Sequence, residues 1–205
     1  NFERDEKFKK NIEKISKEAK KNNAKLILNG LASDIEHYTV DGIHLKSKQL
    51  LNYTSRPISG NYILGASCHN EKELIQAKKL NVNYAFISPV LNTNSHPTET
   101  SLGWGNFKNL AKKANFPVYA LGGMSLLDLE IAKEHGAYGI AMISAINNLS
   151  LLNSNELKYI EKNLECHSGL LCKSDVSTDY SKLTQEIQKI SVQNSTEFLF
   201  QKIFC

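Results

Sequence analysis

The 205-residue sequence lacks any long apolar run. No stretch of about 18 apolar residues is present, which is roughly the minimum length of a membrane-spanning helix. The first residues also lack the pattern of a secretory signal peptide. We therefore expect no association with a membrane.

Cysteine is scarce, and none of the four cysteines forms a C-x-x-C pair. They are Cys68, Cys166, Cys172 and Cys205. This usage indicates free thiols in a reducing, cytoplasmic setting. Two alternatives stay open: a disulfide between Cys166 and Cys172, and a zinc ion on Cys166, His167 and Cys172, for which no fourth ligand is evident.

A strong charge of either sign is also missing. The formal net charge is +4, and 41% of the residues are hydrophobic. This charge is compatible with a phosphorylated ligand but too weak to indicate nucleic-acid binding. The lysine-rich residues 6–22 carry apolar residues near helical spacing, so we interpret their charges as the solvated face of a helix.

What the sequence does contain is a regular alternation of expected strands and helices. Six strands are expected, at residues 25–28, 43–45, 62–67, 84–88, 117–121 and 137–143. Such alternation predicts an α/β fold with a parallel sheet and crossover helices. A closed (β/α)₈ barrel, the TIM barrel, needs eight strands, and this chain begins inside a helix.

The character of the sequence changes near residue 150. We expect residues 1–150 to form the α/β domain and residues 151–205 a helical extension of unknown role. Residues 179–190 have helical periodicity, and the tail FLFQKIFC is strongly apolar. An exposed apolar tail is a liability, so we expect it to pack on this chain or on another one.

A polar loop follows the expected strand that begins at Tyr84. Residues 92–101 have no apolar periodicity, are rich in hydroxyl groups and contain one imidazole, His96. In α/β proteins, loops at the ends of buried strands carry much of the chemistry. We therefore predict that this loop handles an anion.

Several motifs resemble those of the thiamine phosphate synthase and TenI family, in the same order and spacing. They are Asp41-Gly42-Ile43-His44-Leu45, Gly65-x-Ser67-x-His69, Ser88-Pro89-Val90-Leu91-x-Thr93-x-Ser95-x-Pro97, Leu121-Gly122-Gly123-Met124 and the run from Gly139 to Ile146. The resemblance covers about residues 5–147. The sequences around His69, His96 and Trp104 look most similar to the TenI-like domain fused behind Nudix hydrolases.

This resemblance implies a (β/α)₈ barrel in which residues 25–29 form the third strand. Two strands and a basic segment that holds pyrophosphate would then precede Asn1. It also implies a synthase that joins a pyrimidine pyrophosphate to a thiazole phosphate with the help of Mg²⁺. Gly30 and Gln49 stand where the family has metal-binding aspartates, and His96 stands where it has a lysine. We therefore do not expect Mg²⁺ or another metal, we assign no cofactor, and we doubt full synthase activity.

By the same resemblance, a second phosphate site is kept. Gly122 and Gly123 would let backbone N–H groups approach an oxyanion, and Ser144 and Ala145 follow the last strand of the barrel. A helix expected to be capped by Ser125 would add further donors. The alternative is a tight turn without a ligand.

Other candidate residues lie at strand ends and in the polar loop. Asn29, Ser67, Thr93 and Ser95 are candidate substrate or phosphate ligands, and His69 and His96 are candidate acid–base groups. For each, a purely local role is the alternative. TenI-type tautomerases have a histidine where this chain has Pro89. His44 and Trp104 are interpreted as packing residues.

Our leading hypothesis is a domain of thiamine metabolism that binds a thiazole phosphate or a similar heterocyclic phosphate. The alternatives are a non-catalytic module that binds a phosphate ligand or a partner, and one piece of a split barrel protein. A small phosphorylated heterocycle is the expected partner, together with a homo-oligomer or a complementing chain; nucleic acid is not expected.

Overall fold

Six short strands rich in aliphatic and aromatic residues form one parallel sheet in the computed structural model. The structure describes residues 6–21, 24–93, 100–142 and 202–204. The strands are β1 (Ile27–Asn29), β2 (Gly42–Leu45), β3 (Ile63–Cys68), β4 (Tyr84–Ile87), β5 (Val118–Leu121) and β6 (Gly139–Met142), and they pair in chain order. All six strands expected from the sequence are confirmed.

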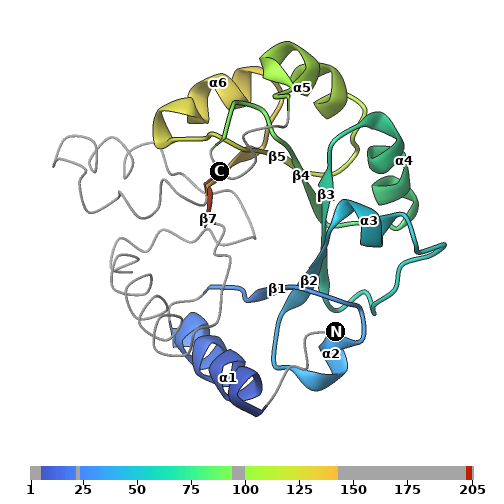
Figure 1. The fold of residues 1–205 in the computed structure, drawn as a ribbon, viewed down its shortest axis with the longest axis vertical. Coiled ribbons are helices and arrows are strands. Elements are labelled where there is room, and N and C mark those ends of the chain that lie inside the picture. The colour runs from blue at the N-terminus through green and yellow to red at the C-terminus, as the bar shows by residue number, and fades with distance from the viewer. Residues whose placement is uncertain (1–5, 22–23, 94–99, 143–201, 205) are drawn as a thin grey trace, which may run out of the picture.

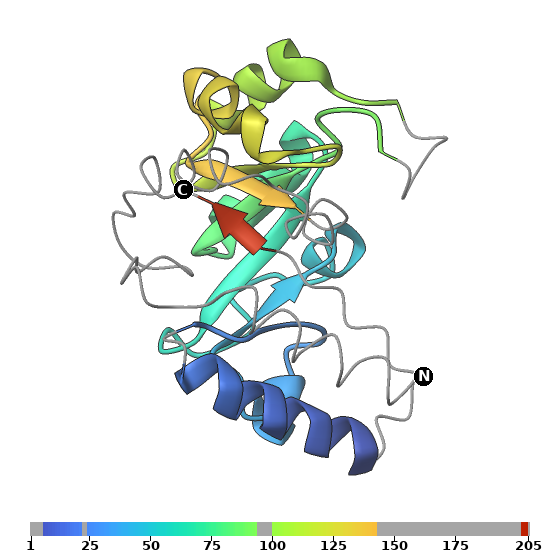
Figure 2. The same cartoon turned by 90° about the vertical axis from the view of Figure 1, so that its left-hand side faces the viewer.

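Helices connect the strands and lie outside the curled sheet (Figure 1). They are α1 (Glu6–Lys21), α2 (Asp34–His37), α3 (Ser47–Leu50), α4 (Glu71–Lys79), α5 (Gly103–Ala111) and α6 (Leu129–Glu134), with the 3₁₀ turn η1 (Leu126–Asp128) before α6. Figure 2 shows α1 at one end of the molecule, with α5 and α6 at the other. None of the helices described is long and apolar enough to cross a membrane.

A seventh strand comes from the apolar tail. β7 (Lys202–Phe204) pairs antiparallel with β6, and Ala141 lies opposite Ile203. The tail therefore pairs with this chain's own sheet, and these three residues differ from the helical extension expected for residues 151–205. The other residues of that extension lie outside the described part of the chain, as do Cys166, His167, Cys172 and Cys205.

The two faces of the sheet carry different side chains, because successive residues of a strand point to opposite faces. The outer face packs against the helices through buried residues that include Leu28, Ile43, Leu45, Leu64, Ala85, Ile87, Val118 and Ile140. The inner face carries a separate aromatic cluster of Tyr84, Phe86 and Tyr119 around Ala141. Both faces are apolar, as a parallel sheet requires.

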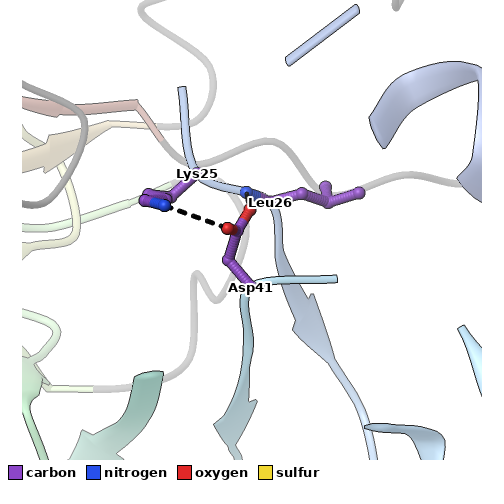
Figure 3. Close-up of polar contacts among 3 residues, drawn as sticks. All are labelled: Lys25, Leu26 and Asp41. Atoms are coloured by element: carbon purple, nitrogen blue, oxygen red, sulfur yellow. Dashed lines mark hydrogen bonds and ion pairs between the residues drawn. The ribbon is translucent and has the colours of Figure 1, made fainter. Parts of the chain in front are cut away.

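An acidic side chain joins the amino ends of β1 and β2. The Asp41 carboxylate accepts a hydrogen bond from the Leu26 backbone N–H at 2.8 Å and forms an ion pair with Lys25 at 3.1 Å (Figure 3). Gly42 follows because a Cβ there would lie 2.8 Å from the Ile63 carbonyl carbon. The Asp-Gly pair of the first motif is therefore explained by strand packing at the amino end of the sheet, away from the carboxyl ends where ligands bind.

Gly65 lies against the aromatic cluster. Because it has no side chain, it leaves room for the side chains of His44 and Tyr84. A Cβ on Gly65 would lie 2.6 Å from His44 Nδ1 and closer still to the Tyr84 ring. We expect Gly65→Ala to lower the free energy of unfolding by about 1–3 kcal/mol through overpacking. Urea denaturation of the full chain measures this change.

The matched control is Gly60→Ala, because no atom lies within 4 Å of a Cβ at Gly60. A change within about 0.5 kcal/mol is expected there. Equal effects of the two substitutions would show that crowding at Gly65 is not the cause.

Candidate functional site

Two residues predicted to bind the ligand lie at carboxyl ends of the sheet, on strands β1 and β3, which β2 separates. Asn29 ends β1 and Ser67 lies one residue before the end of β3. Both have the strand parity opposite to Leu28 and Leu64, which pack on the helices, so both belong to the inner face. Asn29 is exposed and Ser67 is half-buried. The structure therefore brings these two polar groups to the edge where α/β barrels bind ligands.

His44 pairs in register with Asn29, and its ring lies between Ser67 and Tyr84 on the inner face. Its Nε2 is 2.8 Å from Ser67 Oγ, and its Nδ1 is 3.1 Å from Tyr84 Oη. The ring also stacks on Phe86 with the ring centroids 4.7 Å apart. Burial lowers the pKa of His44 to about 3, so the imidazole is neutral near pH 7. The interpretation of His44 as a packing residue is therefore incomplete, since it also binds a candidate ligand residue.

His69 is exposed and has a defined orientation. Its Nδ1 lies 2.7 Å from the Ser88 carbonyl oxygen, which can only accept, so Nδ1 carries the proton. In the neutral ring Nε2 is then unprotonated and can act as a base or an acceptor. This arrangement suits the acid–base role predicted for His69, which stays a prediction.

Glu73, in the first turn of α4, is a buried carboxylate beside the candidate site. It is 6% exposed, and its Oε2 accepts from the His69 backbone N–H at 2.6 Å. Its Oε1 accepts from the Ser47 hydroxyl at 3.1 Å and from the Asn70 side chain at 3.0 Å. Glu73 therefore links α3, the start of α4 and the backbone of His69.

Cys68 lies on the outer face beside this network. It is a free, buried thiol, as the sequence predicts for its cysteines. Burial raises its pKa to about 12, and the nearby Glu73 carboxylate adds to the rise. The thiol is therefore protonated near pH 7, as expected of a packing residue rather than a nucleophile.

The Gly122–Gly123 turn lies against the loop that follows β4. Both glycines have positive φ, +95° and +70°, which disfavours other residues. The carbonyls of Leu121 and Gly122 accept from the N–H groups of Val90 and Leu91, at 2.9 and 3.1 Å. A Cβ on Gly123 would lie 2.5 Å from the Asn92 carbonyl oxygen. The turn therefore needs glycine for both conformation and close approach.

Hydrogen bonds fix both described ends of the polar loop. The Leu102 N–H donates to the Pro89 carbonyl at 2.8 Å, and the Gly103 N–H donates to the Val90 carbonyl at 2.9 Å. Thr93 is half-buried within the loop. The predicted site residues Ser95, His96, Ser144 and Ala145 lie outside the described residues.

The helix cap expected at Ser125 is wrong. Both the N–H and the hydroxyl of Ser125 donate to Asp128 Oδ2, each at 2.7 Å. The helix after the turn is only η1 followed by the six residues of α6. The carboxylate of Asp128 uses these two donors, so Ser125 adds none to a phosphate site beside Gly123.

The motifs that converge on this edge have counterparts in known proteins. Residues 3–146 match the family described as thiamine monophosphate synthase. The chain belongs to this family. The resemblance found in the motifs is thereby confirmed, while the likeness to a Nudix fusion stays a prediction.

Curated relatives carry the same description. The chain is 33% identical over 135 residues to a putative thiamine-phosphate synthase 2 of Aquifex aeolicus, which covers 64% of this chain and 73% of that protein. It is 35% identical over 128 residues to a thiamine-phosphate synthase of Methanococcus maripaludis, covering 59% and 62%. A Prochlorococcus marinus thiamine-phosphate synthase matches at 33% over 125 residues, which is 36% of its length. The chain thus spans less than two thirds of the last two relatives.

A solved structure shows the same fold. The thiamine phosphate pyrophosphorylase of Pyrococcus furiosus superposes with a TM-score of 0.55 and 16% identity, covering 88% of this chain and 77% of that one. At this identity the likeness concerns the fold alone. It identifies the curled six-stranded sheet as TIM-barrel-like, as predicted.

The positions compared with magnesium-binding aspartates of the thiamine monophosphate synthase family do not fit a metal ion. Gly30 is buried and has no side chain, and Gln49 Oε1 accepts from the Lys46 backbone N–H at 2.9 Å. Hard cations such as Mg²⁺ prefer carboxylate oxygens. Within the described ranges, no three His, Cys, Asp or Glu side chains gather as metal ligands would.

The neutral state of His44 predicts a pH dependence of stability. The folded-state pKa is about 3, and an imidazole in the unfolded chain titrates near 6.5. The unfolded chain therefore binds more protons between these values, and stability falls as the pH falls below about 6.5. Between pH 7 and 5.5 we expect a loss of about 1 kcal/mol from this residue.

Urea denaturation at both pH values measures the loss, with His44→Gln as the control that lacks the imidazole. The pH dependence should be weaker in the variant. Parallel profiles for the two proteins would contradict a buried, neutral His44.

Proposed function

We propose that this chain binds a thiazole phosphate or a similar heterocyclic phosphate at the carboxyl edge of β3, β4 and β5. Its family membership supports a ligand of thiamine metabolism, because the curated relatives are described as thiamine-phosphate synthases. Ser67 lies at the end of β3 and His69 directly follows that strand, while Asn29 lies at the carboxyl end of β1, two strands away. We infer that these residues bind the phosphate group of the ligand and that they do not bind a metal ion.

The observation that carries the proposal is the geometry of Gly123. Its Cα lies so close to the loop after β4 that no Cβ fits. Among the described residues nothing accepts a hydrogen bond from its backbone N–H. A backbone donor at φ +70°, at the ligand-binding edge of a barrel, is the arrangement that binds oxyanions without a side chain.

Two side chains at the end of β3 would contact the ligand as well. Ser67 offers a hydroxyl that can donate to the phosphate, and His69, whose Nδ1 donates to the Ser88 carbonyl, offers Nε2 to the heterocycle. A heterocycle has ring nitrogens and substituents that such groups recognise by hydrogen bonding. Binding, with acid–base help from His69, is the function that these groups support.

Magnesium-dependent coupling of two substrates is not part of the proposal. Departure of pyrophosphate needs dense positive charge. Gly30 carries no ligand atom, and Gln49 spends its side-chain oxygen on the start of α3. We therefore infer a binding role for these 205 residues.

Isothermal titration calorimetry of the chain with thiazole phosphate tests the proposed binding. We expect saturable binding that Gly123→Ala weakens by about tenfold or more, because the added methyl group displaces the loop and the donor; tenfold is about 1.4 kcal/mol. Gly103→Ala is the matched control: Gly103 has φ +69°, but nothing lies within 4 Å of its Cβ position. It shares the backbone strain without the close contact.

Circular dichroism should show both variants folded at the titration temperature. Equal affinities of the two variants, or no heat of binding by the parent chain, would contradict the phosphate site.

A turnover assay tests the absence of a working metal site. The chain is incubated with the pyrimidine pyrophosphate and thiazole phosphate, and thiamine phosphate is measured with and without Mg²⁺. We expect no magnesium-dependent product above background, and the calorimetric affinity for thiazole phosphate should not change when Mg²⁺ is added. Magnesium-dependent turnover would overturn our interpretation of Gly30 and Gln49.

A further inference from the structure

Three side chains form a hydrogen-bonded chain on the inner face of the sheet. Tyr84 from β4, His44 from β2 and Ser67 from β3 follow one another, with separations of 3.1 Å and 2.8 Å. Tyr84 is 2% exposed and His44 is 5% exposed, whereas Ser67 is half-buried at the ligand edge. This series of hydrogen bonds therefore leads from the buried Tyr84 to Ser67 at the proposed site.

The protonation state of His44 limits how many protons the Tyr84–His44–Ser67 hydrogen bonds can share. Burial lowers its pKa to about 3, so the ring is neutral and has one N–H donor and one acceptor nitrogen. Two arrangements fit the distances. Either Nδ1 donates to Tyr84 and Ser67 donates to Nε2, or Tyr84 donates to Nδ1 and Nε2 donates to Ser67.

Tyr84 decides between the two arrangements. Among the described residues, His44 Nδ1 is the one hydrogen-bond partner of the Tyr84 hydroxyl. If Nδ1 carried the proton, the buried tyrosine O–H would have no acceptor, at a cost of about 1–3 kcal/mol. If Tyr84 donates to Nδ1, no buried donor is left unpaired. Burial also raises the pKa of Tyr84, so its proton is retained.

We propose that His44 is a positioning residue: held as the Nε2–H tautomer by Tyr84, it donates to Ser67 Oγ and leaves the Ser67 proton free for an anionic ligand. In the opposite tautomer the serine would donate its only proton to the imidazole and present lone pairs alone. A phosphoester oxygen needs a donor, so the tautomer decides whether Ser67 attracts or repels it. The ligand role of Ser67 rests on the proposed function.

The packing around the pair supports this assignment. Gly65 has no side chain where a Cβ would overlap Tyr84 and lie 2.6 Å from His44 Nδ1. The Phe86 ring stacks on the His44 imidazole, with their centroids 4.7 Å apart. The imidazole therefore has little room to turn over and exchange its two nitrogens.

Nitrogen-15 NMR of the histidine-labelled chain tests the tautomer without any ligand. We expect His44, assigned by its absence in His44→Gln, to carry its proton on Nε2. A proton on Nδ1 overturns the inference, whether or not a ligand binds.

A thermodynamic cycle tests the coupling to the ligand, with thiazole phosphate as the probe in calorimetry. Ser67→Ala should weaken binding about tenfold, and His44→Leu should weaken it to a similar extent. In the Ser67→Ala background, His44→Leu should cause no further loss, because its effect passes through the serine hydroxyl. His44→Gln should keep most of the affinity, since an amide N–H can donate to Ser67 while the amide oxygen accepts from Tyr84.

The outcomes separate the two proposals. An absence of binding by the parent chain would overturn the proposed function, while the NMR result would still decide the tautomer. Binding that Ser67→Ala leaves unchanged, or losses from Ser67→Ala and His44→Leu that simply add, would overturn the positioning role and leave the proposed phosphate site intact. A loss of stability in His44→Leu without a change in affinity would give His44 a structural role alone.

Discussion

The pleat of the parallel sheet is the constraint on which the site depends. Alternate residues of each strand face the helices and the barrel interior, so one strand must satisfy two environments at once. In β3, Leu64 and Cys68 pack among the helices while Gly65 and Ser67 face inward. A shift of one residue in register would bury Ser67 among aliphatic side chains and direct Leu64 to the interior.

Glycine and a neutral imidazole resolve the crowding that this arrangement produces. Tyr84, Phe86 and Tyr119 fill the inner face, and Gly65 provides the space in which His44 meets Tyr84. Burial of this imidazole disfavours its charged form, so it is neutral near pH 7. On the inner face of the described sheet, Tyr84, His44 and Ser67 therefore form a hydrogen-bonded series among packed aromatic rings.

At the carboxyl edge of the sheet we propose that neutral donors hold an anion. Gly123 presents a backbone N–H, while Asp128 occupies the donors of Ser125. Glu73 is fully engaged in holding Ser47, His69 and Asn70. Carboxylates therefore serve the scaffold here, and a divalent cation finds no cluster of them in the described part of the chain.

Local pattern determined the six strands and the long amphipathic α1. The start of α4 is fixed just as locally, since the Asn70 side chain accepts from the Glu73 N–H at 3.1 Å and caps the helix. The glycines at 122 and 123 were also identified from sequence, because positive φ restricts the choice of residue within a single turn. The short helix α3 was missed because its four residues are too few for periodicity to show.

Contacts across the sheet were decided only by the tertiary structure. His44 and Tyr84 are 40 residues apart and Ser47 and Glu73 are 26 apart, so no local spacing relates them. Their meeting depends on strand register and on the direction that the pleat gives each side chain. Sequence periodicity determined which segments form the sheet, because it acts within a single strand or helix. Distances between strands decided which polar groups share a proton, and periodicity contains no information about those distances.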